Sequence, residues 1–99
     1  MAFRGQRQSS AMRMQTRIEF FYSRNCPHCA PVRKMLYEIA KDLDKVHIEE
    51  VDAWSEKGEP LAKKYGVHLV PTVVVNGIRC AEGIVGRQQL LSAIRGSLG

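Results

Sequence analysis

The chain has 99 residues, of which 44% are hydrophobic and 25% are charged, and its formal net charge is +5. This length leaves room for one domain, the hydrophobic fraction is too high for an intrinsically disordered chain, and no apolar run approaches the roughly 18 residues that span a membrane. Three of the positive charges lie in residues 1–14 and the others are interleaved with acidic residues, which argues against a nucleic-acid-binding protein.

The N-terminal residues 1–15 are predicted to form a flexible extension to a domain that spans 16–99. They include Arg4, Arg7 and Arg13, but they lack the apolar stretch of a secretory signal. Export is therefore not indicated, and a cytoplasmic location is expected. An organelle transit peptide is the alternative, because such peptides are also rich in arginine and poor in acidic residues.

The first half of the domain alternates strands and helices. Residues 16–22 are rich in β-branched and aromatic side chains and precede a polar turn, which predicts a strand. Apolar residues recur at helical spacing over 27–43, which predicts an amphipathic helix with Asn25 as its N-cap. A second strand is expected over 46–51 and a short second helix over 56–65.

The second half begins with a strongly β-forming run at 72–75. Asn76-Gly77 follows, which is the strongest two-residue signal for a hairpin, and 78–81 supplies the return strand. A final helix is predicted over 87–98 from its apolar spacing. The order β-α-β-α-β-β-α predicts an α/β fold, in which a four-stranded mixed sheet is flanked by three helices. Its first two strands are parallel because a helix joins them.

Cys26 and Cys29 are separated by two residues at the predicted junction of the first strand and the first helix. The free N–H groups and the dipole of a helix N-terminus favour an anion, so Cys26 is expected to be the thiolate nucleophile. Cys29, one turn further on, would resolve the mixed disulfide. Pro27 suits a first helical turn, and a protonated His28 would stabilise the thiolate and make the disulfide more oxidising.

A metal site is the alternative interpretation of the two cysteines, because a pair at this spacing can supply half of a zinc ligand set. The chain has no second pair, and Cys80, His28, His47 and His68 do not have zinc-finger spacing. The pair could also bridge an iron–sulfur cluster across a dimer. Redox chemistry is favoured, and no metal or other cofactor is expected.

Three residues outside the cysteine motif are not expected to take part in the chemistry. Cys80 is expected to be a small buried residue in a strand, and Trp54 to pack near the second helix. His68 lies three residues before Pro71 and could approach the cysteines, but a surface position is the commoner case for a loop histidine.

Four segments together resemble the short thioredoxin- or glutaredoxin-like proteins, in particular the small archaeal type. They are 20–29 with the cysteine motif, Val70-Pro71-Thr72, Asn76-Gly77 and 83–86. The resemblance covers about residues 16–98 and implies the thioredoxin fold. It implies a monomeric thiol–disulfide oxidoreductase that acts on protein disulfides. It also implies that Pro71 follows a cis peptide bond beside the disulfide, and that the backbone before Pro71 pairs with the substrate chain.

Two positions depart from the family pattern. Thioredoxins usually carry a buried aspartate six residues before the first cysteine for proton transfer, and Phe20 stands there. Glutaredoxins that use glutathione usually show Gly-Gly and an acidic residue after the last strand, whereas 82–87 reads Glu-Gly-Ile-Val-Gly-Arg. Glutathione-dependent activity is therefore the weaker alternative, and a flavoprotein thioredoxin reductase is the expected electron donor.

Overall fold

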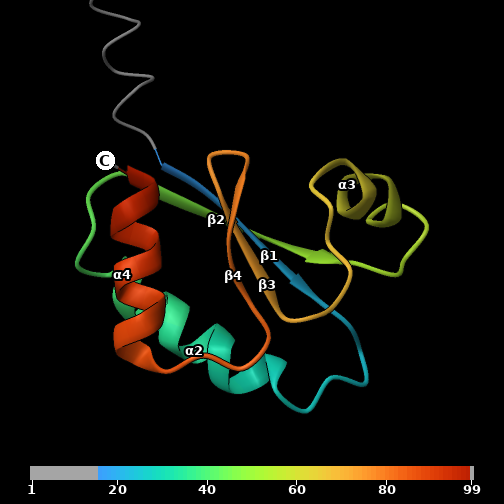
Figure 1. The fold of residues 1–99 in the computed structure, drawn as a ribbon, viewed down its shortest axis with the longest axis horizontal. Helices are drawn as coiled ribbons and strands as arrows, with labels where there is room; N and C mark the ends of the chain where they lie inside the picture. Colours follow the sequence, from blue (N-terminus) through green and yellow to red (C-terminus); the bar gives the residue numbers. More distant parts are fainter. Residues whose placement is uncertain (1–15, 99) are drawn as a thin grey trace, which may run out of the picture.

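A four-stranded sheet with the strand order β2–β1–β3–β4 forms the centre of the protein (Figure 1). The structure is a computed structural model that describes residues 16–98, so the predicted extension at 1–15 lies outside the described residues. The strands are β1 (Thr16–Tyr22), β2 (Val46–Asp52), β3 (Thr72–Val75) and β4 (Ile78–Glu82), and the helices are α2 (Cys29–Ala40), α3 (Glu59–Lys64) and α4 (Arg87–Leu98). The predicted element order and the four-stranded mixed sheet are confirmed, since β1 is parallel to β2 and antiparallel to β3.

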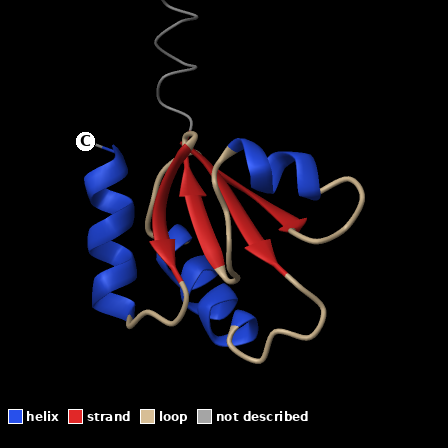
Figure 2. Ribbon diagram, turned by 45° about the vertical axis from the view of Figure 1, so that its right-hand side comes forward, coloured by secondary structure: helices blue, strands red, loops and turns tan. Residues whose placement is uncertain are grey.

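The sheet has a helix layer on each face (Figure 2). Side chains alternate between the faces of a strand, so the adjacent residues Phe20 and Phe21 of β1 enter two different cores. Phe20 lies in the larger core, with residues of α2 and α4, and Phe21 lies in the smaller core, with Ala62 of α3. Because β3 is covered on both faces, all four of its residues are buried, as in strands at the centre of an α/β sheet.

The predicted hairpin between β3 and β4 is present, and it is tied to the start of β1. Asn76 and Gly77 have φ values of 50° and 83°, the left-handed conformation that a tight two-residue turn requires. The Asn76 side chain accepts a hydrogen bond from Arg17 N–H at 2.9 Å, and Asn76 N–H donates to the Arg17 carbonyl at 2.8 Å. The turn therefore fixes the register of three strands at this end of the sheet.

The first helix begins later than its periodicity predicted. α2 starts at Cys29, with His28 at the N-cap and no side-chain capping hydrogen bond, so the prediction that Asn25 caps this helix is wrong. Residues 23–28 instead form a loop and turns, in which Cys29 N–H donates to the Cys26 carbonyl at 3.4 Å.

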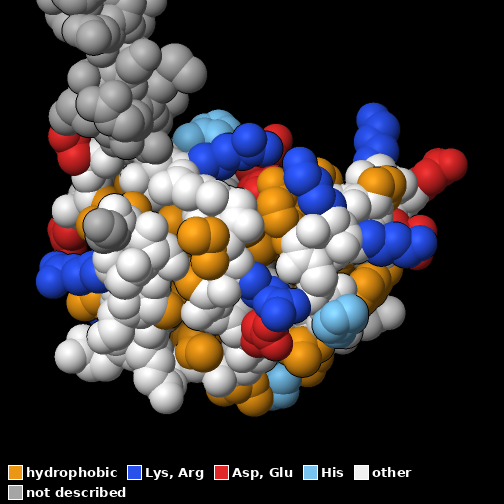
Figure 3. All heavy atoms as spheres, turned by 45° about the horizontal axis from the view of Figure 1, so that its top comes forward, with side chains coloured by type: hydrophobic (Ala, Val, Ile, Leu, Met, Phe, Trp, Pro, Cys, Tyr) orange, Lys and Arg blue, Asp and Glu red, His pale blue; other side chains and the backbone are white. Residues whose placement is uncertain are grey.

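Two properties of the described part of the chain bear on its function: the length of its helices and the distribution of charge on its surface. Among residues 16–98, no helix is long and apolar enough to cross a bilayer. On the face shown in Figure 3, basic and acidic side chains lie side by side, with apolar side chains between them. This face has no continuous basic patch of the kind that nucleic-acid-binding surfaces carry.

Candidate active site

The site lies at the end of the sheet where the loop to α2 begins. In the strand register, Tyr22 at the end of β1 pairs with Asp52 at the end of β2. Thr72 at the start of β3 pairs with Phe21 on one side and with Glu82, at the end of β4, on the other. The loops after β1, β2 and β4 and the loop before β3 therefore meet at one end of the sheet, where the arrows of β1 and β2 end in Figure 1.

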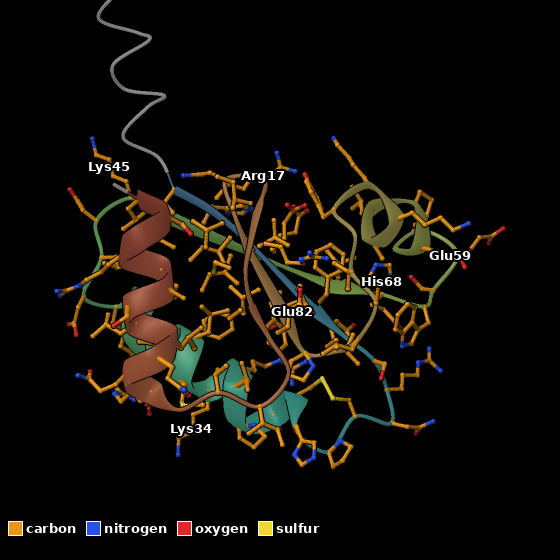
Figure 4. The ribbon with its side chains drawn as sticks, viewed as in Figure 1. Arg17, Lys34, Lys45, Glu59, His68 and Glu82 are labelled. Carbon is orange, nitrogen blue, oxygen red and sulfur yellow. A yellow bond between two sulfur atoms is a disulfide. The ribbon has the colours of Figure 1, made fainter. Side chains whose placement is uncertain are left out.

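Cys26 and Cys29 are joined by a disulfide with a Cα–Cα distance of 5.5 Å, drawn in yellow in Figure 4. The two cysteines differ in exposure. Cys29 is 2% exposed and belongs to the larger core, whereas Cys26 is partly exposed and packs at the edge of that core. A partner molecule can therefore reach Cys26 more readily than Cys29.

Pro27 and His28 occupy the turn between the two cysteines, and both are exposed. His28 is the N-cap of α2 and directly precedes the buried Cys29 in the chain. The sequence prediction placed Cys26 at the helix N-terminus itself. In the structure Cys26 is three residues before the helix, and the loop in front of α2 holds it.

The peptide bond between Val70 and Pro71 is cis, as the family resemblance implied. The loop around it is held by two hydrogen bonds: Thr72 Oγ1 donates to the Leu69 carbonyl at 2.7 Å, and Gly83 N–H donates to the Pro71 carbonyl at 2.7 Å. Pro71 is buried, and Val70 is partly exposed and precedes β3. The backbone of Val70 is thus outside the strand pairing of the sheet.

A depression of about 520 Å³ adjoins the cysteine loop, and sequence reasoning missed it. It is lined by Ser23, Arg24, Asn25, Asp52, Trp54 and Ser55. Trp54 was expected to pack near the second helix, but it is 52% exposed and forms part of this lining, so that expectation is wrong. A signal was present in the sequence, since a tryptophan in a polar Asp-Ala-Trp-Ser-Glu run has few apolar neighbours to pack against.

Comparison with known proteins agrees with this geometry. A family model described as a thioredoxin domain matches residues 16–95. The chain belongs to the thioredoxin family. A probable thioredoxin of Methanothermobacter marburgensis and a thioredoxin of Methanocaldococcus jannaschii are each 32% identical to it over 82 residues, which is 82% of this chain and 94% of each relative.

Solved thioredoxin structures show the same fold. A mutant thioredoxin from Halobacterium salinarum NRC-1 superposes with a TM-score of 0.68 at 21% identity, over 86% of this chain and 76% of that chain. Thioredoxin O2 from Arabidopsis thaliana in its oxidised state superposes with a TM-score of 0.68 at 19% identity, over 96% of this chain and 89% of that chain. The thioredoxin fold predicted from the sequence is therefore confirmed. With its family membership and its Cys-X-X-Cys disulfide, the protein is a thiol–disulfide oxidoreductase.

Phe20, which stands where thioredoxins usually carry a buried aspartate, is part of the larger core. Phe20 is fully buried, and the Arg33 guanidinium lies over its ring at 5.3 Å. In the register, Phe20 faces Glu50 of β2, which accepts hydrogen bonds from Arg33 Nε at 3.0 Å and from the Tyr37 hydroxyl at 2.9 Å. Burial and the Glu50 hydrogen bond raise the pKa of Tyr37, so its hydroxyl remains a donor at neutral pH. The Glu50 carboxylate on β2 is thus bound by two side chains of α2.

Cys80 and His68 take no part in the disulfide. Cys80 is a partly buried thiol on β4, and burial raises its pKa. His68 is exposed on the loop between α3 and β3, where Figure 4 labels it. Within residues 16–98, no three His, Cys, Asp or Glu side chains come together as a metal-ion site.

Proposed function

We propose that the protein reduces disulfides of other proteins, with Cys26 as the attacking thiolate and Cys29 as the resolving thiol. The observation that carries this assignment is the difference in exposure between the two cysteines, of which Cys29 is 2% exposed and Cys26 partly exposed. A substrate disulfide is bulky, so it meets the accessible sulfur first. The buried thiol then acts within the complex.

The reaction proceeds by two exchanges. The Cys26 thiolate attacks one sulfur of the substrate disulfide, and the other substrate sulfur leaves as a thiolate. Cys29, as its thiolate, then attacks the Cys26 sulfur of the mixed disulfide and releases the second substrate sulfur. Two electrons have passed to the substrate, and the Cys26–Cys29 disulfide seen in the structure is the product form.

The substrate chain binds at Val70 and Pro71. The cis bond belongs to the loop before β3, at the end of the sheet where the cysteine loop also lies. Since the Val70 backbone takes no part in the sheet, it can pair with an extended segment on either side of the substrate disulfide. Such pairing recognises backbone, which suits an enzyme that acts on many proteins.

The dithiol must be regenerated by an electron donor. We assign this role to a flavoprotein thioredoxin reductase in the cytoplasm, with the protein acting as a monomer. Support comes from membership of the thioredoxin family and from the 82–87 segment, which lacks the Gly-Gly-acidic pattern of glutathione-dependent relatives. Pro27 and His28 adjust the potential at which the exchange occurs.

Replacement of single cysteines tests these roles. In an insulin-reduction assay, Cys26→Ser is expected to abolish activity because the attacking thiolate is lost, whereas Cys29→Ser is expected to accumulate a mixed disulfide that mass spectrometry detects. Cys80→Ser, which removes a thiol outside the disulfide, is the matched control and should keep the activity. If alkylation of the reduced protein at neutral pH labels Cys29 before Cys26, the assignment of the nucleophile is wrong.

A further inference from the structure

β2 is an edge strand, and within residues 16–98 its outer backbone pairs with no other strand. The strand order places it at one side of the sheet, next to β1 alone. Thr16 N–H donates to the Lys45 carbonyl just before β2, and Ala53 N–H donates to the Tyr22 carbonyl just after it, each at 2.8 Å. The backbone groups of a paired strand point to its two sides at alternate residues, so positions 47, 49 and 51 face β1.

The backbone groups of Ile48 and Glu50 therefore face away from the sheet. An unpaired edge of this kind offers N–H and C=O groups to a further extended segment. Proteins commonly cover such an edge, because it would otherwise pair with other molecules. A segment that covers the outer edge of β2 has to match the side chains around it.

An acidic groove follows this edge. Its volume is about 280 Å³, and three of the eight residues that line it are acidic, whereas one is basic. The lining consists of the last four residues of β2, 49–52, together with Ser55, Lys57, Gly58 and Leu61. A ligand of this groove is therefore expected to be cationic.

Two of the three carboxylates in the groove have no cationic partner. Glu50 pairs with Arg33, whereas Glu49 and Asp52 form no ion pair with any residue of 16–98. Both carboxylates are thus available to a positively charged segment.

A further carboxylate lies beside the groove in the neighbouring strand. Glu19 is the Cα partner of Glu49 in the register, so the two side chains lie on the same face of the sheet. Glu19 is 1% exposed, and its Oε2 accepts no hydrogen bond within residues 16–98. Arg17 Nη2 lies 3.5 Å from this oxygen, but the Arg17 side chain is largely exposed. Glu19 therefore adds to the negative charge behind Glu49.

Residues 1–15 have the charge that complements this groove. They include Arg4, Arg7 and Arg13 and no acidic residue, so their formal side-chain charge is +3. They lead into Thr16, which is the Cα partner of Val46 at the start of β2. The segment is therefore joined to the sheet beside the strand that carries the groove.

The segment is also long enough to reach the groove. A strand rises about 3.3 Å per residue, so positions 49–52 lie about 10–20 Å from Val46 along β2. An extended chain spans about 3.3–3.6 Å per residue, which gives residues 1–15 a reach of about 50 Å. Because the segment is covalently linked, its effective concentration at the groove is in the millimolar range, and a weak contact suffices.

We propose that residues 1–15 bind along the free edge of β2 in the same molecule. Their arginine side chains bind Glu49 and Asp52 in the groove, and their backbone pairs with the outer groups of β2. This contact uses neither cysteine of the disulfide, so it is a binding surface in addition to the proposed active site. It closes the edge to a second copy of the chain.

Amide hydrogen exchange of the oxidised full chain, followed by NMR, tests this contact. The Ile48 and Glu50 amides report on the outer edge of β2. The His47 and Val51 amides, which face β1, report on the sheet itself. Each variant therefore contains its own measure of whether the sheet is intact.

Loss of the positive charge of the segment is expected to open the edge. In the triple variant Arg4→Gln, Arg7→Gln and Arg13→Gln, the two outer amides should exchange about three- to tenfold faster than in wild type, because the bound fraction falls. The two inner amides should exchange as in wild type.

A double-mutant cycle shows whether the groove is the site of the contact. Glu49→Gln should speed exchange at the outer amides in the wild-type background and have no further effect in the triple variant. The cycle also cancels any change that this substitution makes in the intrinsic exchange rate of Glu50. Glu59→Gln is the matched control, because Glu59 is exposed on α3, lines no part of the groove and points away from the sheet (Figure 4). It should leave the outer amides as in wild type.

Four results would overturn the proposal. Equal exchange at the outer amides in wild type and the triple variant would show that the segment does not cover the edge. An effect of Glu49→Gln that is the same in both backgrounds would show that groove and segment act independently. Protection that rises with protein concentration would assign the edge to a second copy. Free exchange in wild type that added hexa-arginine slows would assign the groove to a basic partner protein.

Discussion

At the scale of single residues, His28 is the candidate for tuning the reactivity of the dithiol. It is exposed, it is the N-cap of α2, and its side chain makes no capping hydrogen bond. The imidazole is therefore not engaged in holding the helix. Its expected role is electrostatic, since a positive charge near a thiolate favours the thiolate.

Replacement of His28 by glutamine should make the disulfide harder to reduce. We expect this because a positive charge at position 28 would favour the reduced, thiolate-bearing form, and for this two-electron couple about 30 mV corresponds to about 1.4 kcal/mol. We expect the reduction potential of His28→Gln to fall by tens of millivolts, measured by equilibration with a redox buffer, and the alkylation of Cys26 to require a higher pH.

His47→Gln provides the control, because His47 is an exposed histidine near the start of β2, at the other end of the sheet. It should leave the potential unchanged. If His28→Gln also leaves both the potential and the pH profile unchanged, Pro27 and the loop geometry determine the reactivity without the histidine.

At the scale of elements, the connection from β2 to α3 is closely packed at Gly58. Gly58 is the N-cap of α3, and a Cβ atom at this position would be 1.9 Å from the Asp52 carbonyl oxygen. That carbonyl already accepts the Ser55 hydroxyl, so it cannot move without breaking the loop. The first residues of α3 and the wall of the depression are therefore one structural unit.

Gly58→Ala is expected to lower the free energy of unfolding by about 1–3 kcal/mol, because the methyl group forces the backbone apart. Gly96→Ala is the matched change in α4, where a Cβ atom would meet nothing within 4 Å. It should raise the free energy of unfolding by up to about 1 kcal/mol, since alanine favours the helix over glycine. Urea unfolding of both variants measures this, and a Gly58→Ala protein as stable as wild type would show that the loop adapts.

At the scale of the whole molecule, the larger core includes a titratable thiol at its edge. Cys80 of β4 packs against the larger core, and its burial raises the pKa of the thiol above the ordinary value of 9.0. Above pH 9 the unfolded chain loses this proton while the folded protein still holds it. Unfolding then releases a proton, so the free energy of unfolding falls as the pH rises through this window.

Cys80→Ala should flatten that alkaline decline. With the Cys26–Cys29 disulfide intact, Cys80 is the remaining thiol of the chain, so the change isolates its titration. We expect wild type to lose more stability than Cys80→Ala between about pH 7 and about pH 10, measured by urea unfolding of the oxidised proteins. Parallel declines in the two proteins would show that the Cys80 thiol does not titrate differently on folding.

Much of the fold followed from local patterns in the sequence. β1 and α4 have the bounds that the sequence predicted, and the Asn76-Gly77 hairpin is where its turn residues placed it. These features depend on side-chain periodicity and on the backbone freedom of turn residues, which act within a few positions. The cysteine pair could also be predicted to be redox-active, because two thiols at this spacing have few roles besides redox chemistry in a chain with three cysteines.

The cis bond before Pro71 could be predicted only from the family resemblance, because most X-Pro bonds in folded proteins are trans. Four other features were not predicted from the sequence and became clear only in the tertiary structure. The burial of Cys29 and the exposure of Trp54 follow from which surfaces the elements cover, and the start of α2 at Cys29 follows from the loop before it. The depression joins residues 23–25 to residues 52–55, which meet because β1 and β2 pair in parallel. Sequence periodicity is local, whereas burial, register and the charge around a sulfur are set by chain segments that are distant in sequence.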